Sequence, residues 1–110
     1  MSLSNLSGLI DIHQVSKEIS GATLLEVVAA VAGKRVKIHA INISVDLESE
    51  LVLTTGAETL FKFYTENNWT LFEQQIGGVS IFEGEVGQDV SIQSDQSGLS
   101  GWIRVVYTLG

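Results

Sequence analysis

The chain of 110 residues contains no cysteine and no proline, and each absence restricts its structure. Without cysteine it forms no disulfide and offers no thiolate ligand to a metal, and its redox compartment leaves no mark on the sequence. Proline at its average usage near 5% would supply about five residues. Because proline removes a hydrogen bond from a central strand, its absence fits a chain made mainly of paired strands.

Basic residues are also scarce. Six Lys and Arg stand against thirteen Asp and Glu, which gives a net charge of −7 and an isoelectric point near 4.5. Nucleic acids and anionic lipids both attract basic surfaces, so this composition argues against either as a direct partner. Hydrophobic residues make up 45% of the chain and charged residues only 17%. This apolar surplus favours an oligomer.

Long hydrophobic runs are missing as well. The first eight residues have no basic region and no long apolar stretch, so we expect no secretory signal. No run reaches the roughly 18 apolar residues that span a bilayer, so we expect no membrane partner. We expect synthesis in a cytoplasm, an N-terminal arm at residues 1–8 and a single domain at residues 9–110.

Apolar and polar residues alternate with a period of two through most of the chain, which predicts strands. About eight short strands are expected, at residues 9–15, 35–47, 50–54, 59–64, 69–74, 79–83, 89–94 and 102–109. Turns rich in Gly, Asn and Ser separate them at intervals of about ten residues. This spacing predicts an all-β sandwich or barrel with antiparallel strands.

Two segments depart from the simple alternation of a strand. In the window at residues 35–47 the apolar positions are even-numbered up to Ala40 and odd-numbered from Ile41. A phase change of one residue indicates a β-bulge, so we predict one near Ala40 to Asn42, with Ala40 facing inward and His39 outward. Residues 22–32 fit either an amphipathic helix that ends at Gly33 or a strand. The β-branched valines favour the strand.

The last predicted strand is apolar on both faces. Its odd-numbered positions from Ile103 to Leu109 form one apolar face, and Trp102 and Val106 lie on the other. A strand that is apolar on both faces is usually covered on both sides. We therefore predict a subunit interface at Trp102 and Val106. A loop of the same chain over Trp102 is the alternative.

Residues with catalytic or metal-binding chemistry are present but not in a convincing pattern. His13 and His39 are too few for a catalytic zinc site, which needs three protein ligands. The alternating acids Asp46, Glu48 and Glu50 resemble a calcium site less than a solvated strand edge, because no EF-hand loop surrounds them. No Gly-x-Ser-x-Gly motif occurs. We expect no enzyme activity, no cofactor and no metal.

Aromatic residues cluster at one predicted turn. Tyr64, Asn67, Asn68 and Trp69 together offer apolar rings beside adaptable amides, the combination with which many β-sandwiches bind sugars. We treat these four residues as a candidate ligand or contact loop. The alternative is that Trp69 packs at the margin of the core.

Two segments resemble parts of known proteins. The stretch TLLEVVAAVAGKRVKI, residues 23–38, joins an apolar run to a strand through a Gly-Lys-Arg turn, and GWIRVVY at residues 101–107 begins the last strand. Both resemble segments of short bacteriophage virion proteins. The likeness covers the early strands and the last one, whereas residues 51–95 are not clearly matched.

The resemblance implies a fold and a role. Proteins of this kind are β-sandwiches or jelly rolls that sit on the particle surface, often as trimers. It therefore implies a non-enzymatic virion protein, first of all a trimeric capsid decoration (cement) protein that clamps neighbouring copies of the major capsid protein. A tail or head fibre, or a glycan-binding receptor module, is the alternative. A free carbohydrate-binding sandwich is a further possibility from a different class.

Overall fold

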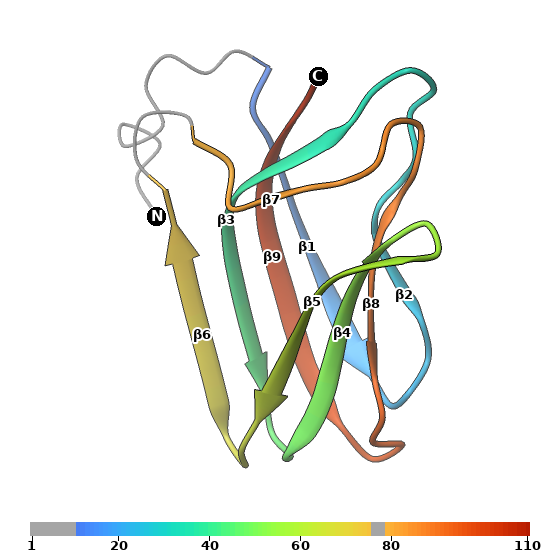
Figure 1. Cartoon of the computed structure of the whole chain (residues 1–110). Coiled ribbons are helices and arrows are strands. Elements are labelled where there is room, and N and C mark those ends of the chain that lie inside the picture. Colours follow the sequence, from blue (N-terminus) through green and yellow to red (C-terminus); the bar gives the residue numbers. More distant parts are fainter. Residues whose placement is uncertain (1–10, 76–78) are drawn as a thin grey trace.

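The computed structural model describes residues 11–75 and 79–110, and within them all regular structure is β-strand. The strands are β1 (His13–Ser20), β2 (Leu25–Val28), β3 (Val36–Val45), β4 (Ser49–Thr55), β5 (Glu58–Thr65), β6 (Trp69–Gln74), β7 (Phe82–Glu83), β8 (Val90–Ser94) and β9 (Ser100–Leu109). Every pairing between them is antiparallel. The predicted all-β class is confirmed (Figure 1).

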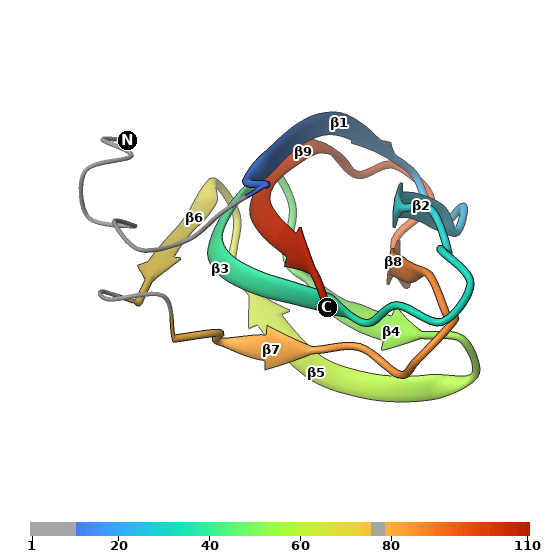
Figure 2. The same ribbon diagram turned by 90° about the horizontal axis from the view of Figure 1, so that it is seen from above.

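The strands form two sheets that pack face to face. One has the order β1-β9-β3-β6, and β7 pairs with the first part of β3 on the same side as β6; the other has the order β2-β8-β4-β5. The chain changes sheet at every connection except β4–β5 and β6–β7. This order is that of a jelly roll, so the predicted jelly-roll-like sandwich is confirmed. Seen from above, β1 and β2 close one side of the sandwich, and β5 and β7 lie together on the other (Figure 2).

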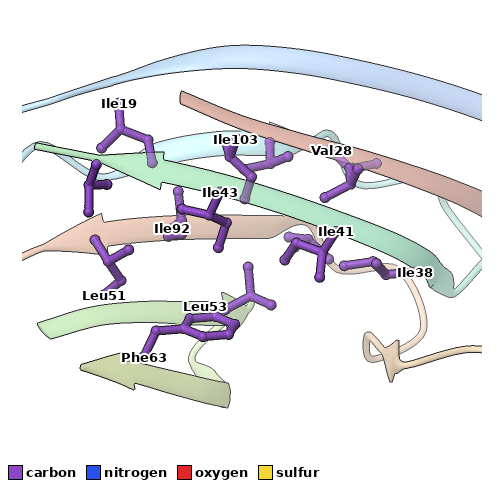
Figure 3. Close-up of a cluster of buried hydrophobic side chains, with 14 of the residues drawn as sticks. Ile19, Val28, Ile38, Ile41, Ile43, Leu51, Leu53, Phe63, Ile92 and Ile103 are labelled. Carbon is purple, nitrogen blue, oxygen red and sulfur yellow. The ribbon is translucent and has the colours of Figure 1, made fainter. Parts of the chain in front are cut away.

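The core lies between the sheets and is built from the inward-facing positions of each strand. Its most deeply buried members include Ile19, Ile38, Ile41, Ile43, Leu51, Leu53, Ile92 and Ile103, all at 2% exposure or less (Figure 3). Rings of Phe61, Phe63, Trp69 and Phe82 fill the side between β5 and β7. The accessible area of 5862 Å² is close to the roughly 6,000 Å² expected for a compact monomer of this mass. One chain therefore closes its own core.

The predicted bulge is present, one residue before the predicted range. Ile38 pairs with Tyr107 and Ala40 pairs with Val106, so His39 is the extra residue of β3. Ile38 and Ile41 both face the core, which preserves the apolar surface across the bulge. The inward placement of Ala40 was wrong. Ala40 lies on the outer face of the sheet, where it packs with Val106 and Ile12.

The boundaries of several elements differ from the prediction. β1 starts at His13 and runs to Ser20, whereas the sequence placed a strand at residues 9–15, part of which lies outside the described residues. Only residues 25–28 of the ambiguous segment at 22–32 form a strand, so the helix is excluded and residues 29–32 are an exposed loop. The predicted strand at 79–83 is reduced to β7. The predicted arm at residues 1–8 lies outside the described part of the chain.

Candidate functional site

An open groove of about 830 Å³ lies at the end of the sandwich where β1 and β3 finish and β6 and β9 begin. It is the lower end in Figure 1. Four separate segments line it: Glu18, Ile19 and Ser20; Ser44, Val45 and Asp46; Asn68 and Thr70; and Ser100, Gly101 and Trp102. We call this set the groove. Its position depends on the jelly-roll order, which places β1, β9, β3 and β6 side by side.

Backbone hydrogen bonds hold the groove segments in place. The amide of Asp46 donates to the Ser100 carbonyl at 3.1 Å, and the Ser100 amide donates to Oδ1 of Asp46 at 2.8 Å. The Asn68 amide donates to the Asp46 carbonyl at 3.1 Å. Asp46 therefore ties the start of β9 and the β5–β6 turn to the end of β3.

Gly101 lets the two central strands approach each other closely beneath the groove. A side chain at Gly101 would collide with the Ser44 carbonyl oxygen and would lie 2.8 Å from Cγ1 of Val45. Next to it, Trp102 projects from the outer face with 42% of its surface exposed. The hydroxyls of Ser44 and Thr70 lie 3.3 Å apart across β3 and β6. The groove thus combines an accessible indole ring with hydroxyl, amide and carboxylate groups.

The four residues of the aromatic turn predicted from the sequence lie in different surroundings in the structure. Trp69 faces inward and packs against the core, with its ring 6.2 Å from that of Phe63, whereas Tyr64 is 70% exposed. Oδ1 of Asn67 accepts a hydrogen bond from the Glu48 amide at 2.9 Å. Asn68 adopts a left-handed φ of 57° in the turn and lines the groove. Of the four predicted residues, only Asn68 reaches the groove.

Trp102 and Val106, which were predicted to form one subunit interface, also differ in exposure. Val106 is 1% exposed, because Ile12 of the same chain packs over it and over Ala40. It is therefore not a surface residue, and the covering element comes from the N-terminal side of β1. Trp102 remains accessible, so no loop of the described chain covers it.

The remaining candidate residues have structural roles. His39 is buried at the bulge, where Nε2 lies 2.8 Å from Oγ1 of Thr108 and Nδ1 lies 3.1 Å from the Val79 carbonyl oxygen. The ring of His13 stacks on that of Tyr107 at 5.1 Å. Glu50 lies 3.5 Å from the Lys62 ammonium. Within residues 11–75 and 79–110, no group of three or more His, Cys, Asp or Glu side chains is arranged to hold a metal ion.

The opposite end of the sandwich presents a different surface. Residues 29–32, Ala-Ala-Val-Ala, are all exposed in the β2–β3 loop, and Val31 is 39% exposed. The amide of Gly87 donates to the Lys34 carbonyl at 2.7 Å and joins this loop to the β7–β8 turn, where Val86 is 53% exposed. We call residues 29–32 together with Val86 the apolar loop end; both loops are at the upper end in Figure 1.

Charged residues lie beside the apolar loop end, on β7 and at the start of β3. The hydroxyl of Ser80 donates to Oε1 of Glu83 at 2.9 Å, and this bond lowers the pKa of Glu83 below its ordinary value. The positive charges of Lys37 and Arg35 act in the same direction, and the Arg35 guanidinium lies 3.5 Å from Oε2 of Glu83. The pair joins β7 to the residue before β3.

Comparisons with known proteins add no family to this description. No protein-family model matches the chain, and a search of curated proteins finds no match. The described residues include no helix long and apolar enough to cross a membrane. We therefore infer function from the groove and the apolar loop end.

Proposed function

We propose that the protein is a non-enzymatic structural component of a bacteriophage particle, a capsid decoration (cement) protein that forms a homotrimer and binds the major capsid protein. The observation that carries this proposal is the apolar loop end. Four consecutive uncharged small or branched residues lie exposed at residues 29–32, beside the exposed Val86. Contiguous exposed apolar surface of this kind marks a protein–protein contact.

The surroundings of the apolar loop end agree with a contact surface. Lys34 and Glu85 flank it, and the Glu85 amide is fixed by Oγ1 of Thr55 at 2.9 Å. An apolar centre with a polar rim is the usual anatomy of a protein interface. Since the core is already closed within one chain, these apolar residues are available for a partner instead of being needed for folding.

The resemblance to phage virion proteins supports the same role. Its two segments, far apart in the sequence, come together in the fold. Ile38 of the first segment pairs with Tyr107 of the second, and the rest of the second segment pairs with later residues of β3. The apolar part of the first segment becomes the exposed loop. The matched residues therefore contribute to the central strand pair, and the first segment also supplies the proposed contact surface.

Repetition would make a small contact effective on a shell. A trimer that forms through the apolar loop end presents three copies of its remaining surface to the shell at once, and linked weak contacts bind far more tightly than one contact alone. A decoration protein that bridges neighbouring capsid subunits in this way stabilises the particle without any chemical reaction. The protein would be found on the virion surface.

Particles of the phage that lack this chain provide the test. The double variant Val31→Asp, Val86→Asp places two charges in the apolar loop end, and desolvating them opposes any apolar contact. We expect wild-type protein to sediment as a trimer and to co-sediment with the particles. The double variant should remain folded by circular dichroism yet lose both properties.

The control is Leu24→Asp, which adds a charge at an exposed apolar residue in the β1–β2 connection, away from the apolar loop end. It should assemble and bind particles as the wild type does. A wild-type protein that stays monomeric and does not bind particles would refute the proposal. So would a double variant that behaves as the wild type.

A tail or head fibre, or a receptor-binding module, is the second candidate. The groove favours it, since an exposed tryptophan among polar groups is suited to ligand recognition. Such a module would bind its ligand without stabilising the capsid shell. Imaging of particles with and without the chain separates the two candidates by showing whether it sits on the head shell.

A further inference from the structure

We propose that the groove binds a neutral carbohydrate, with a sugar ring stacked on Trp102 and its hydroxyls bonded to Glu18, Asp46 and nearby hydroxyl groups. This inference does not depend on the virion role. It concerns the end of the sandwich opposite the apolar loop end, and it places the site elsewhere than the turn of Tyr64 and Trp69.

The indole of Trp102 is the first argument. It stands on the outer face of β9 with 42% of its surface exposed, and it borders the groove. Its cross-strand neighbours on this face are Glu18 of β1 and Ser44 of β3, which are polar. A flat apolar ring framed by polar groups offers a surface for the apolar face of a sugar ring while its edge hydroxyls find partners.

The polar lining is the second argument. Oδ1 of Asp46 accepts the Ser100 amide, and its other carboxylate oxygen forms no hydrogen bond with the described residues. Neither Glu18 nor Asp46 forms an ion pair within the described part of the chain. Carboxylates accept two hydrogen bonds at once and can receive neighbouring sugar hydroxyls, while serine, threonine and asparagine both donate and accept.

The charge of the groove determines which class of ligand it can bind. Two carboxylates border the groove, and none of the described residues that line it is Lys or Arg. Phosphates, sulfated sugars and sialylated glycans are disfavoured in the groove, since Lys17 and Arg104 line a separate neighbouring hollow with Glu18 and Trp102. A metal ion is not favoured, because no group of three or more His, Cys, Asp or Glu side chains in the described part of the chain is arranged to hold one. A neutral sugar uses the carboxylates, the hydroxyls and the ring together.

The groove is also preformed and of suitable size. Its base consists of paired backbone of β1, β9 and β3, and the Asp46–Ser100 bonds fix its rim. A site that is already ordered loses little conformational freedom on binding. Its volume of about 830 Å³ falls within the range of 300–1,000 Å³ that is typical of ligand sites.

The test uses the intact protein and a printed panel of neutral oligosaccharides, which includes glucose, galactose, mannose and N-acetylglucosamine series, together with sialyllactose. Hits are then titrated in solution by isothermal calorimetry. We expect at least one neutral series to bind and sialyllactose to fail. Trp102→Ala should lower the association constant by about tenfold or more, because the stacking surface is lost.

Two further variants keep the result specific. Phe72→Ala removes an aromatic ring that is 49% exposed on the same outer face but does not line the groove, and it should leave binding unchanged. Glu18→Gln keeps the size of the side chain. It should weaken binding, because it replaces the charged carboxylate that accepts hydrogen bonds from the sugar hydroxyls. If no neutral glycan binds, or if Trp102→Ala and Phe72→Ala behave alike, the inference is wrong. A failure of this kind would leave the trimer and its particle binding untouched.

Discussion

The two ends of this sandwich differ in how their surfaces are built. The groove is assembled from four segments whose backbones are paired or hydrogen-bonded to each other, and its side chains are mostly polar. The apolar loop end consists of two connections between strands, joined by the bond from Gly87 to Lys34, and its side chains are mostly apolar. Both surfaces are accessible in the single chain, but Ile19 and Val45 of the groove also belong to the core, whereas no residue of the apolar loop end does.

This difference indicates different uses. An ordered polar surface with one aromatic ring is suited to a small ligand that needs fixed partners. An apolar pair of loops is suited to a protein partner, since apolar contact needs area more than defined directions.

The largest expected effect concerns the support of the groove. Gly101→Ala forces a methyl group against the Ser44 carbonyl and the Val45 side chain, and β9 would have to move away from β3. We expect the free energy of unfolding to fall by about 3 kcal/mol. Urea denaturation followed by circular dichroism measures the change.

Two other glycines provide the comparison. Gly98→Ala meets only Cδ1 of Leu47 at an ordinary 3.8 Å, so its stability should remain close to that of the wild type. Gly33, next to the apolar loop end, has open space around it but a φ of 72°, so Gly33→Ala should cost only about 1 kcal/mol of backbone strain. A loss at Gly33 as large as that at Gly101 would contradict the distinction between the two ends.

A smaller effect is expected from the charges near the apolar loop end. The pKa of Glu83 is lowered in the folded protein by the Ser80 hydroxyl and by Lys37 and Arg35. Its carboxylate therefore adds stability above the ordinary carboxyl pKa, and this contribution is lost as the pH falls through the lowered value. Because Glu83 is exposed, the contribution is small.

The variant Glu83→Gln isolates this contribution. The difference in unfolding free energy between the wild type and this variant should be largest at neutral pH and should vanish in acid. Glu58→Gln, on the exposed β4–β5 hairpin, supplies a control for general charge effects. A difference in unfolding free energy that grows as the pH falls would contradict the predicted direction of this pH dependence.

Period-two patterning was sufficient to predict the class of fold, because inward positions such as Ile43 and Val45 alternate with polar ones. It also predicted the bulge, since a core that stays apolar on both sides of His39 requires a phase change. It could not give the strand order, because pairing between β3 and β9 depends on residues about 60 positions apart. The short β7 was overestimated for a similar reason, since only its contact with β3 defines it.

The surface was less predictable than the core. Val106 and Trp102 have the same parity on β9, and the sequence treated them alike. Packing of Ala40 and Ile12 against Val106 accompanies its burial, whereas Trp102 lies exposed. Trp69 and Tyr64 flank the same turn, yet strand register turns the first inward. The groove itself joins residues from Glu18 to Trp102, and no local pattern in the sequence marks them as neighbours.

Amide chemical shifts of the isotope-labelled protein test the two-ended account most directly, in one sample series. Raising the protein concentration should perturb amides of residues 29–34 and 85–88, whereas adding the oligosaccharide with the strongest panel signal should perturb those of residues 18–20, 44–46 and 100–102. Two separate sets of perturbed amides are the predicted result. A single shared set, or perturbation of neither end, would contradict the account.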